Sequence, residues 1–149
     1  MTTQTQSEKS CSLDCIEILR AVNKFRFLTI NQLRASLAIK GYFPAKNTLF
    51  KLWRNGYLER LVLTRASRRI SYCYVFALNR QGARELTISR GLERVFYLKA
   101  NAKRSTIFLE HTILINNFRI CLECLERRSR EFQLTSWRQH RREVKINLK

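Results

Sequence analysis

With 149 residues, 45% of them hydrophobic, the chain is long enough for one domain with an ordinary core. Its 29 Lys and Arg residues against 11 Asp and Glu residues give a formal net charge of +18, which predicts a polyanion as partner. No apolar run approaches the roughly 20 residues of a membrane-spanning helix, and the polar N-terminus lacks the layout of a signal peptide, so we expect a cytoplasmic protein with no membrane partner.

Residues 1–12 are rich in Thr, Gln and Ser and carry few apolar groups, so we expect a disordered arm there. Apolar residues recur at helical spacing from Cys15 to Val22. Asp14, the only aspartate of the chain, adds negative charge to the first turn. This pattern predicts a first helix that ends near Phe25.

Thr29 and Gln32 have the spacing of a capping box, in which each side chain bonds the backbone amide of the other residue. A short second helix is therefore expected to begin after Thr29, and Gly41 can supply its left-handed stop. Pro44, the only proline, suits the start of a third helix, where an amide would be unpaired in any case.

The third helix is expected to present two different faces. Its inward face is marked by Leu49, Leu52 and Trp53. Polar and basic residues at spacings of three and four project together from the opposite face: Lys46, Asn47, Lys51 and Arg54.

A basic hairpin follows this helix. Residues 57–63 and 71–78 are predicted strands, and the loop of residues 64–70 between them contains Arg65, Arg68 and Arg69. Residues 40–70 hold eight Lys and Arg residues against the single acid Glu59. This concentration of charge predicts that the third helix and the hairpin bind double-stranded DNA.

Each basic residue has an expected role in a helix that enters the major groove. Lys46, Lys51 and Arg54 would contact phosphates or guanine edges, and Asn47 would pair with adenine. The hairpin residues Arg65, Arg68 and Arg69 would reach the phosphate backbone or the neighbouring minor groove.

Beyond the hairpin, Asn79 is placed to cap a short helix through Leu86, and residues 89–105 are expected to be a basic linker. A long helix is predicted from residue 106 to about residue 127. Its apolar stripe contains Ile107, His111, Leu114, Phe118, Cys121 and Leu125. We expect a buried His111 in the helix packing, and two short strands in the basic tail.

The stripe of the long helix is wider than a small domain needs to cover its back. Residues 106–149 are therefore expected to form a dimerisation or partner-binding segment, and we favour a homodimer over packing within one chain.

These elements give an α+β, mainly α fold: a winged helix-turn-helix over residues 13–88, with a C-terminal long helix and short strands. The chain also resembles the replication-relaxation proteins of plasmids and integrative elements. The resembling segments are Ile18-Leu19-Arg20 to Phe27-Leu28-Thr29, Gln32-Leu33, Leu52-Trp53-Arg54-Asn55-Gly56-Tyr57-Leu58, Tyr74-Val75-Phe76-Ala77-Leu78-Asn79-Arg80-Gln81-Gly82-Ala83-Arg84, Leu109-Glu110-His111 and Asn116-Asn117-Phe118-Arg119.

The resemblance implies work on the DNA of a mobile genetic element, in replication, in mobilisation during conjugation, or in their control. It favours an accessory factor at a transfer or replication origin, with a relaxase or replication initiator as protein partner. An autoregulating transcription regulator would use the same fold. Longer family members look as though they continue into a nuclease-like part, so a truncated nuclease acting through His111 is a further alternative, and a basic RNA-binding or membrane-surface protein is another.

Catalytic patterns are missing from the sequence. It contains no nucleophile beside a base, no glycine-rich phosphate loop and no pair of metal-binding carboxylates, and one aspartate is few for magnesium-dependent strand cleavage. We therefore expect a non-enzyme with no catalytic residues and no cofactor.

The five cysteines could in principle provide metal ligands, because Cys121 and Cys124 are separated by two residues and Cys11 and Cys15 could complete a set of four. However, the first pair lies in a helical run and the second lies far away near the N-terminus. We expect reduced thiols, most of them in the core, and no metal site.

Overall fold

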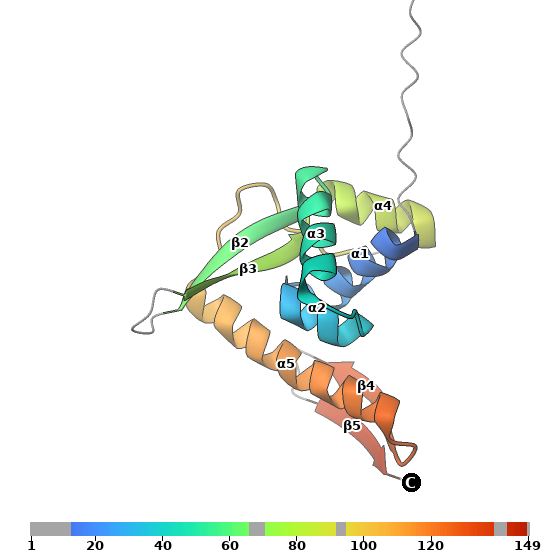
Figure 1. The fold of residues 1–149 in the computed structure, drawn as a ribbon. Helices are drawn as coiled ribbons and strands as arrows, with labels where there is room; N and C mark the ends of the chain where they lie inside the picture. The colour runs from blue at the N-terminus through green and yellow to red at the C-terminus, as the bar shows by residue number, and fades with distance from the viewer. Residues whose placement is uncertain (1–12, 66–70, 92–94, 139–142, 149) are drawn as a thin grey trace, which may run out of the picture.

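The computed structural model describes residues 13–65, 71–91, 95–138 and 143–148 (Figure 1). Its elements are α1 (Leu13–Phe25), β1 (Leu28–Thr29), α2 (Ile30–Leu37), α3 (Tyr42–Arg54), β2 (Leu58–Arg65), β3 (Ser71–Leu78), α4 (Arg80–Arg90), α5 (Thr106–Arg128), β4 (Phe132–Arg138) and β5 (Glu143–Leu148). Helices α1 to α3 pack together, and β2 and β3 extend from them as a wing. The fold is the predicted winged helix-turn-helix, whereas the expected arm of residues 1–12 lies outside the described residues.

The sheet of the wing separates two hydrophobic cores. Its antiparallel strands have the order β1-β3-β2, and the short β1, which the sequence did not indicate, pairs Leu28 with Phe76. Successive side chains of a strand point to opposite faces. Leu58 and Phe76 consequently join the core beneath α1 to α3, and Leu63 and Val75 join a second core with α5.

The predicted capping box at the start of α2 is confirmed. The Thr29 hydroxyl accepts a hydrogen bond from the Gln32 amide at 3.2 Å, and the Gln32 side chain accepts one from the Thr29 amide at 3.1 Å. The expected stop at Gly41 is wrong, because Ala38 with φ 52° takes the left-handed position that ends α2. Gly41, with φ 90°, instead directs the chain into α3.

Helix α4 is attached to the end of α3 by close backbone contacts. The Asn79 side chain accepts a hydrogen bond from the Gly82 amide at 3.0 Å, as expected of its cap, and also donates to the Gly56 carbonyl. A Cβ atom at Gly82 would lie 2.2 Å from the Tyr57 carbonyl oxygen, so only glycine fits here. The helix continues to Arg90, further than the sequence indicated.

The described part of the expected linker packs on the wing. Leu98 is buried, and its amide donates to the Leu78 carbonyl at 2.7 Å. Residues 95–105 therefore contribute to the second core.

Helix α5 buries the face opposite to the predicted stripe. Its buried residues are Leu109, Thr112, Ile113, Asn116 and Ile120. The stripe is exposed instead, with 80% of Ile107, 66% of Leu114, 55% of Phe118 and 47% of Leu125 accessible. His111 is exposed as well, so the prediction of a buried histidine is wrong.

The error has a physical cause. The buried face of α5 includes two polar residues whose hydrogen bonds are satisfied, since Thr112 donates to the Phe108 carbonyl and Asn116 donates to the chain that links α1 to β1. The regular spacing of apolar residues along α5 therefore marks its exposed face, because polar residues interrupt the apolar pattern of its buried face.

The hairpin of β4 and β5 lies beside the C-terminal half of α5 (Figure 1). The Trp137 ring lies 6.2 Å from that of Phe118, and the Leu134 amide donates to Glu126 Oε1 at 3.2 Å. Arg119 donates a hydrogen bond from Nε to Glu123 Oε1 at 3.1 Å. Burial lowers the pKa of this guanidinium, whereas the neighbouring Glu123 raises it.

We predict that Asn116→Ala lowers the free energy of unfolding by roughly 1–3 kcal/mol, because the carbonyls of Phe25 and Phe27 lose a buried donor. Urea unfolding followed by circular dichroism measures this loss. Asn117→Ala is the matched control: its side chain is exposed, and Gln32 keeps its bond to the Ile113 carbonyl, so the loss should stay below about 1 kcal/mol. Equal losses would contradict the special role of Asn116.

Candidate nucleic-acid interface

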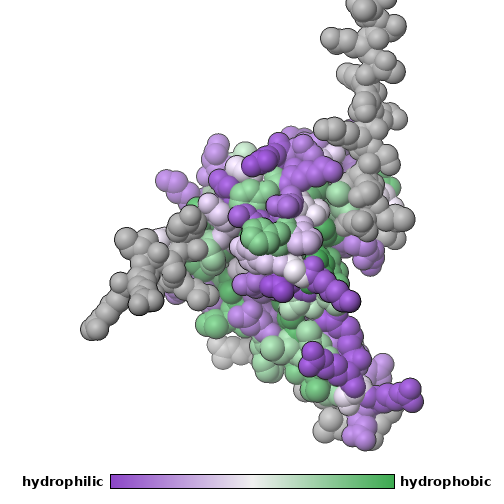
Figure 2. Space-filling model, viewed as in Figure 1, coloured by the Kyte–Doolittle hydropathy of each residue, from purple (hydrophilic) through white to green (hydrophobic). Residues whose placement is uncertain are grey.

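Helix α3 is anchored along one side and free along the other. Ala45, Leu49 and Leu52 are buried against the core, and the helix packs on α2 and β2. In the view of Figure 1, α3 lies in front of the sheet. On the same face of the molecule, hydrophilic residues lie above and below hydrophobic ones in the region of this helix (Figure 2).

Three of the four residues predicted on this helix share its free side. Asn47, Lys51 and Arg54 are exposed, and their spacing of four and then three places them in one row along the axis. Such a row is suited to the edges and phosphates of a DNA groove. Lys46 is half-buried and lies at the flank, with its Nζ 5.6 Å from the centre of the Phe50 ring.

The flank carries one residue that the sequence prediction missed. The Arg60 guanidinium lies 3.6 Å from the centre of the Trp53 ring and 4.6 Å from that of Tyr74. Phe50 completes this aromatic platform between α3 and the wing, with its ring 5.5 Å from that of Tyr74. Arg60 forms no ion pair among the described residues, so its planar donors remain available to a phosphate.

The alternation of side chains along β2 could have identified Arg60 from the sequence. Arg60 shares a face of β2 with Leu58 and Val62, and it lies opposite Phe76 in the sheet. A charged residue at an inward-facing strand position needs a compensating partner, and aromatic rings provide one through cation–π contact.

The structure describes the position of only one of the three arginines predicted to bind DNA from the wing. Arg65 is the last residue of β2 and pairs with Ser71, so it lies in the strand and not in the loop where the sequence analysis placed it. Arg68 and Arg69 lie outside the described residues. Their contacts with DNA stay predictions.

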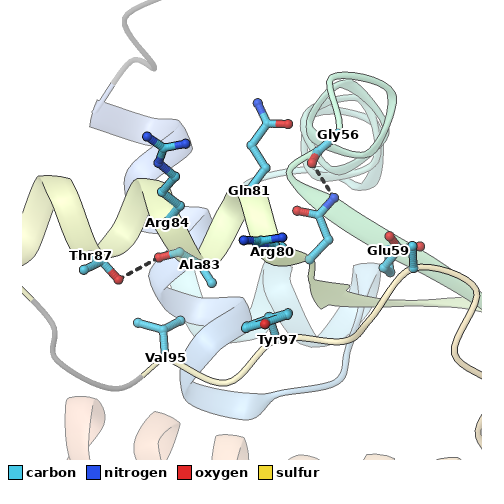
Figure 3. A pocket seen from close by; sticks show the side chains of 11 residues that line it. Gly56, Glu59, Arg80, Gln81, Ala83, Arg84, Thr87, Val95 and Tyr97 are labelled. Atoms are coloured by element: carbon cyan, nitrogen blue, oxygen red, sulfur yellow. Dashed lines mark hydrogen bonds between the residues drawn. The ribbon is translucent and has the colours of Figure 1, made fainter.

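A pocket lies between α4, the turn from α3 to β2 and the segment of residues 95–100 (Figure 3). Its lining includes Glu59, Arg80, Arg84 and Tyr97, together with backbone at Gly56. Among the described residues, this lining contains one carboxylate and no histidine or cysteine, so these residues do not bring together an acid and a base, or a nucleophile and a base.

The cysteines of the described residues are divided between the core and α5, with Cys73 on β3. Cys15 is buried in the first core, whereas Cys121 is exposed and Cys124 is half-buried on α5; Cys11 lies outside the described residues. Among the residues that are described, no three His, Cys, Asp or Glu side chains are grouped to hold a metal ion. No helix in these parts of the chain has the length and apolar content to cross a membrane.

A family model described as replication-relaxation matches residues 19–148. The chain belongs to the replication-relaxation family. This confirms the resemblance found in the sequence, and the match extends through the long helix and the C-terminal hairpin. Family membership and the winged-helix fold together support DNA binding in replication.

Among solved structures, the replication-relaxation chain is similar to a crystal structure of a mutant MarR from E. coli. The two share 13% sequence identity with a TM-score of 0.42, and the match covers 81% of this chain and 68% of that one. No curated protein sequence gives a significant match.

Two substitutions test the interface on any double-stranded DNA. We predict that Lys51→Ala and Arg60→Ala each weaken binding and lower the slope of log affinity against log salt by about 0.9, the value for one lost phosphate contact. Fluorescence anisotropy at several salt concentrations measures both effects. Arg20→Ala, which removes an exposed arginine that pairs with Glu17 on α1, is the control and should leave affinity and slope nearly unchanged. Similar losses in all three variants would indicate binding through net charge alone.

Proposed function

We propose that this replication-relaxation protein binds a specific double-stranded DNA sequence in a plasmid or other mobile element. It acts as an accessory factor at a transfer or replication origin, where it helps to assemble a relaxase or replication initiator. The observation that carries this proposal is the exposed row of Asn47, Lys51 and Arg54 beside the stacked Arg60.

The exposed row of α3 and Arg60 have different roles in this mechanism. With α3 in the major groove, Asn47 can pair with adenine and Arg54 can bond guanine, which gives sequence preference. Arg60 is held against the Trp53 ring, so it loses little rotamer freedom when it bonds a phosphate, and it fixes the register of α3 in the groove. The basic wing would follow the backbone beside this groove.

Strand cleavage is assigned to the partner in this proposal. His111 is exposed on α5, on the face opposite to its buried residues, and Asp14 is the only aspartate in the sequence. We therefore propose a protein that marks or bends the origin and does not cut it, working in the cytoplasm where the element's DNA lies.

An autoregulating transcription regulator would use the same surface. It differs from the accessory factor only in where its binding site lies, because a winged helix reads a promoter and an origin by the same contacts. Location of the bound site therefore decides between them.

We predict that DNA recovered with the protein from its native host is enriched at a transfer or replication origin. Sequencing of cross-linked, precipitated DNA measures this, and Lys51→Ala should remove the enrichment while Arg20→Ala keeps it. Enrichment confined to the protein's own promoter would support the regulator and reject the accessory factor. Magnesium-dependent nicking of the recovered site that is lost in His111→Ala would overturn the non-enzymatic mechanism.

A further inference from the structure

The outer face of α5 has the spacing of a coiled-coil seam. Ile107, His111, Leu114, Phe118, Cys121 and Leu125 follow one another at intervals of four, three, four, three and four residues. This alternation is the a and d pattern that lets one helix insert its side chains between those of another. All six residues are exposed, and they lie on the side of α5 that faces away from Leu109, Ile113 and Ile120.

Charge distinguishes this face from the rest of the molecule. Between Arg104 and Arg127 the only basic residue is Arg119, and its guanidinium is taken up by Glu123 and by the Lys24 carbonyl. Two copies of a chain with a net charge of +18 repel one another across most of their surfaces. Between Ile107 and Leu125, two copies can therefore approach along the seam without bringing exposed Lys or Arg side chains of α5 together.

We propose that the seam is covered by α5 of a second copy, with the two helices antiparallel and Leu114 opposite Phe118 of the partner subunit. In this register Ile107 meets Leu125 of the partner subunit, and His111 meets Cys121 of the partner subunit. The resulting contact is two-fold symmetric, as a dimer of identical chains requires.

The choice of an antiparallel pair rests on the proposed function. In Figure 1, α5 runs across the view and α3 lies in front of the sheet. A two-fold axis along α5, which a parallel pair needs, would turn the second α3 to the back. An axis along the line of sight makes the helices antiparallel and keeps both α3 helices in front, where one DNA duplex can meet them. Opposed helix dipoles also favour this direction.

The C-terminal hairpin borders the seam without covering it. Trp137 contacts Phe118 from the side, yet Phe118 and Leu125 remain about half exposed, at 55% and 47%. The N-terminal half of the seam is more open, with 80% of Ile107 exposed. In an antiparallel pair, the more exposed N-terminal half of each α5 therefore packs against the C-terminal half of the other α5, beside which the hairpin lies.

The dimer is tested by light scattering coupled to gel filtration in the absence of DNA. Wild-type protein should have twice the chain mass of 17.8 kDa, and Leu114→Glu should halve that mass without loss of helical signal, because Leu114 is 66% exposed within one chain. Ile88→Glu is the matched control, since Ile88 is an isoleucine of 70% exposure on α4, and this variant should stay dimeric. A monomeric wild type, or a dimeric Leu114→Glu, would overturn the proposal.

The direction of the helices is tested by oxidation. His111→Cys should form a covalent dimer with the native Cys121 of the partner subunit, and Cys121→Ser in the same chain should abolish it. A parallel pair would instead cross-link wild-type Cys121 to its own copy, which would refute the antiparallel register. Both experiments are made without DNA, so failure of the proposed origin binding leaves their outcome unchanged.

Discussion

The arrangement of this molecule depends on one buried amide. Asn116, in the middle of α5, donates through Nδ2 to the Phe25 carbonyl at 3.1 Å and to the Phe27 carbonyl at 2.7 Å. These carbonyls flank Arg26, whose left-handed φ of 64° makes the tight turn between α1 and β1. Within this turn the Phe27 amide also donates to the Phe25 carbonyl at 2.8 Å, so Asn116 is a second donor to Phe25. Buried carbonyls that lose a donor are costly. Asn116 satisfies them and thereby fixes α5 to the start of the winged helix.

Gln32 extends this contact into the helix-turn-helix unit. Its side chain caps α2 and also donates to the Ile113 carbonyl at 2.8 Å and to Asn117 at 2.7 Å. One residue thus sets where α2 begins and where α5 crosses it. Because hydrogen bonds are directional, unlike apolar packing, they define the angle between α5 and the helices that carry the DNA-binding row. An outward seam on α5 and an outward row on α3 are therefore held in a fixed relation.

Local signals in the sequence were sufficient for much of the fold. Thr29 and Gln32 are three residues apart, so their capping box could be predicted, and strand alternation predicted the wing. The misses have different causes. β1 has only two residues, too few for a pattern, and Arg60 contacts Trp53 only because the chain turns from α3 into β2 between them. Predicting which face of α5 is buried failed because Asn116 is polar, and its partners lie about ninety residues earlier in the chain.

The distribution of charge links the two functional faces. In a dimer that pairs through α5, two chains of charge +18 are held together by a neutral seam against their mutual repulsion. DNA bound along α3 and the wing neutralises part of this charge and weakens the repulsion. Because binding free energies are reciprocal, whatever DNA adds to the stability of the pair, the pair adds to the affinity for DNA. A protein of this kind assembles most completely where two of its sites lie close together.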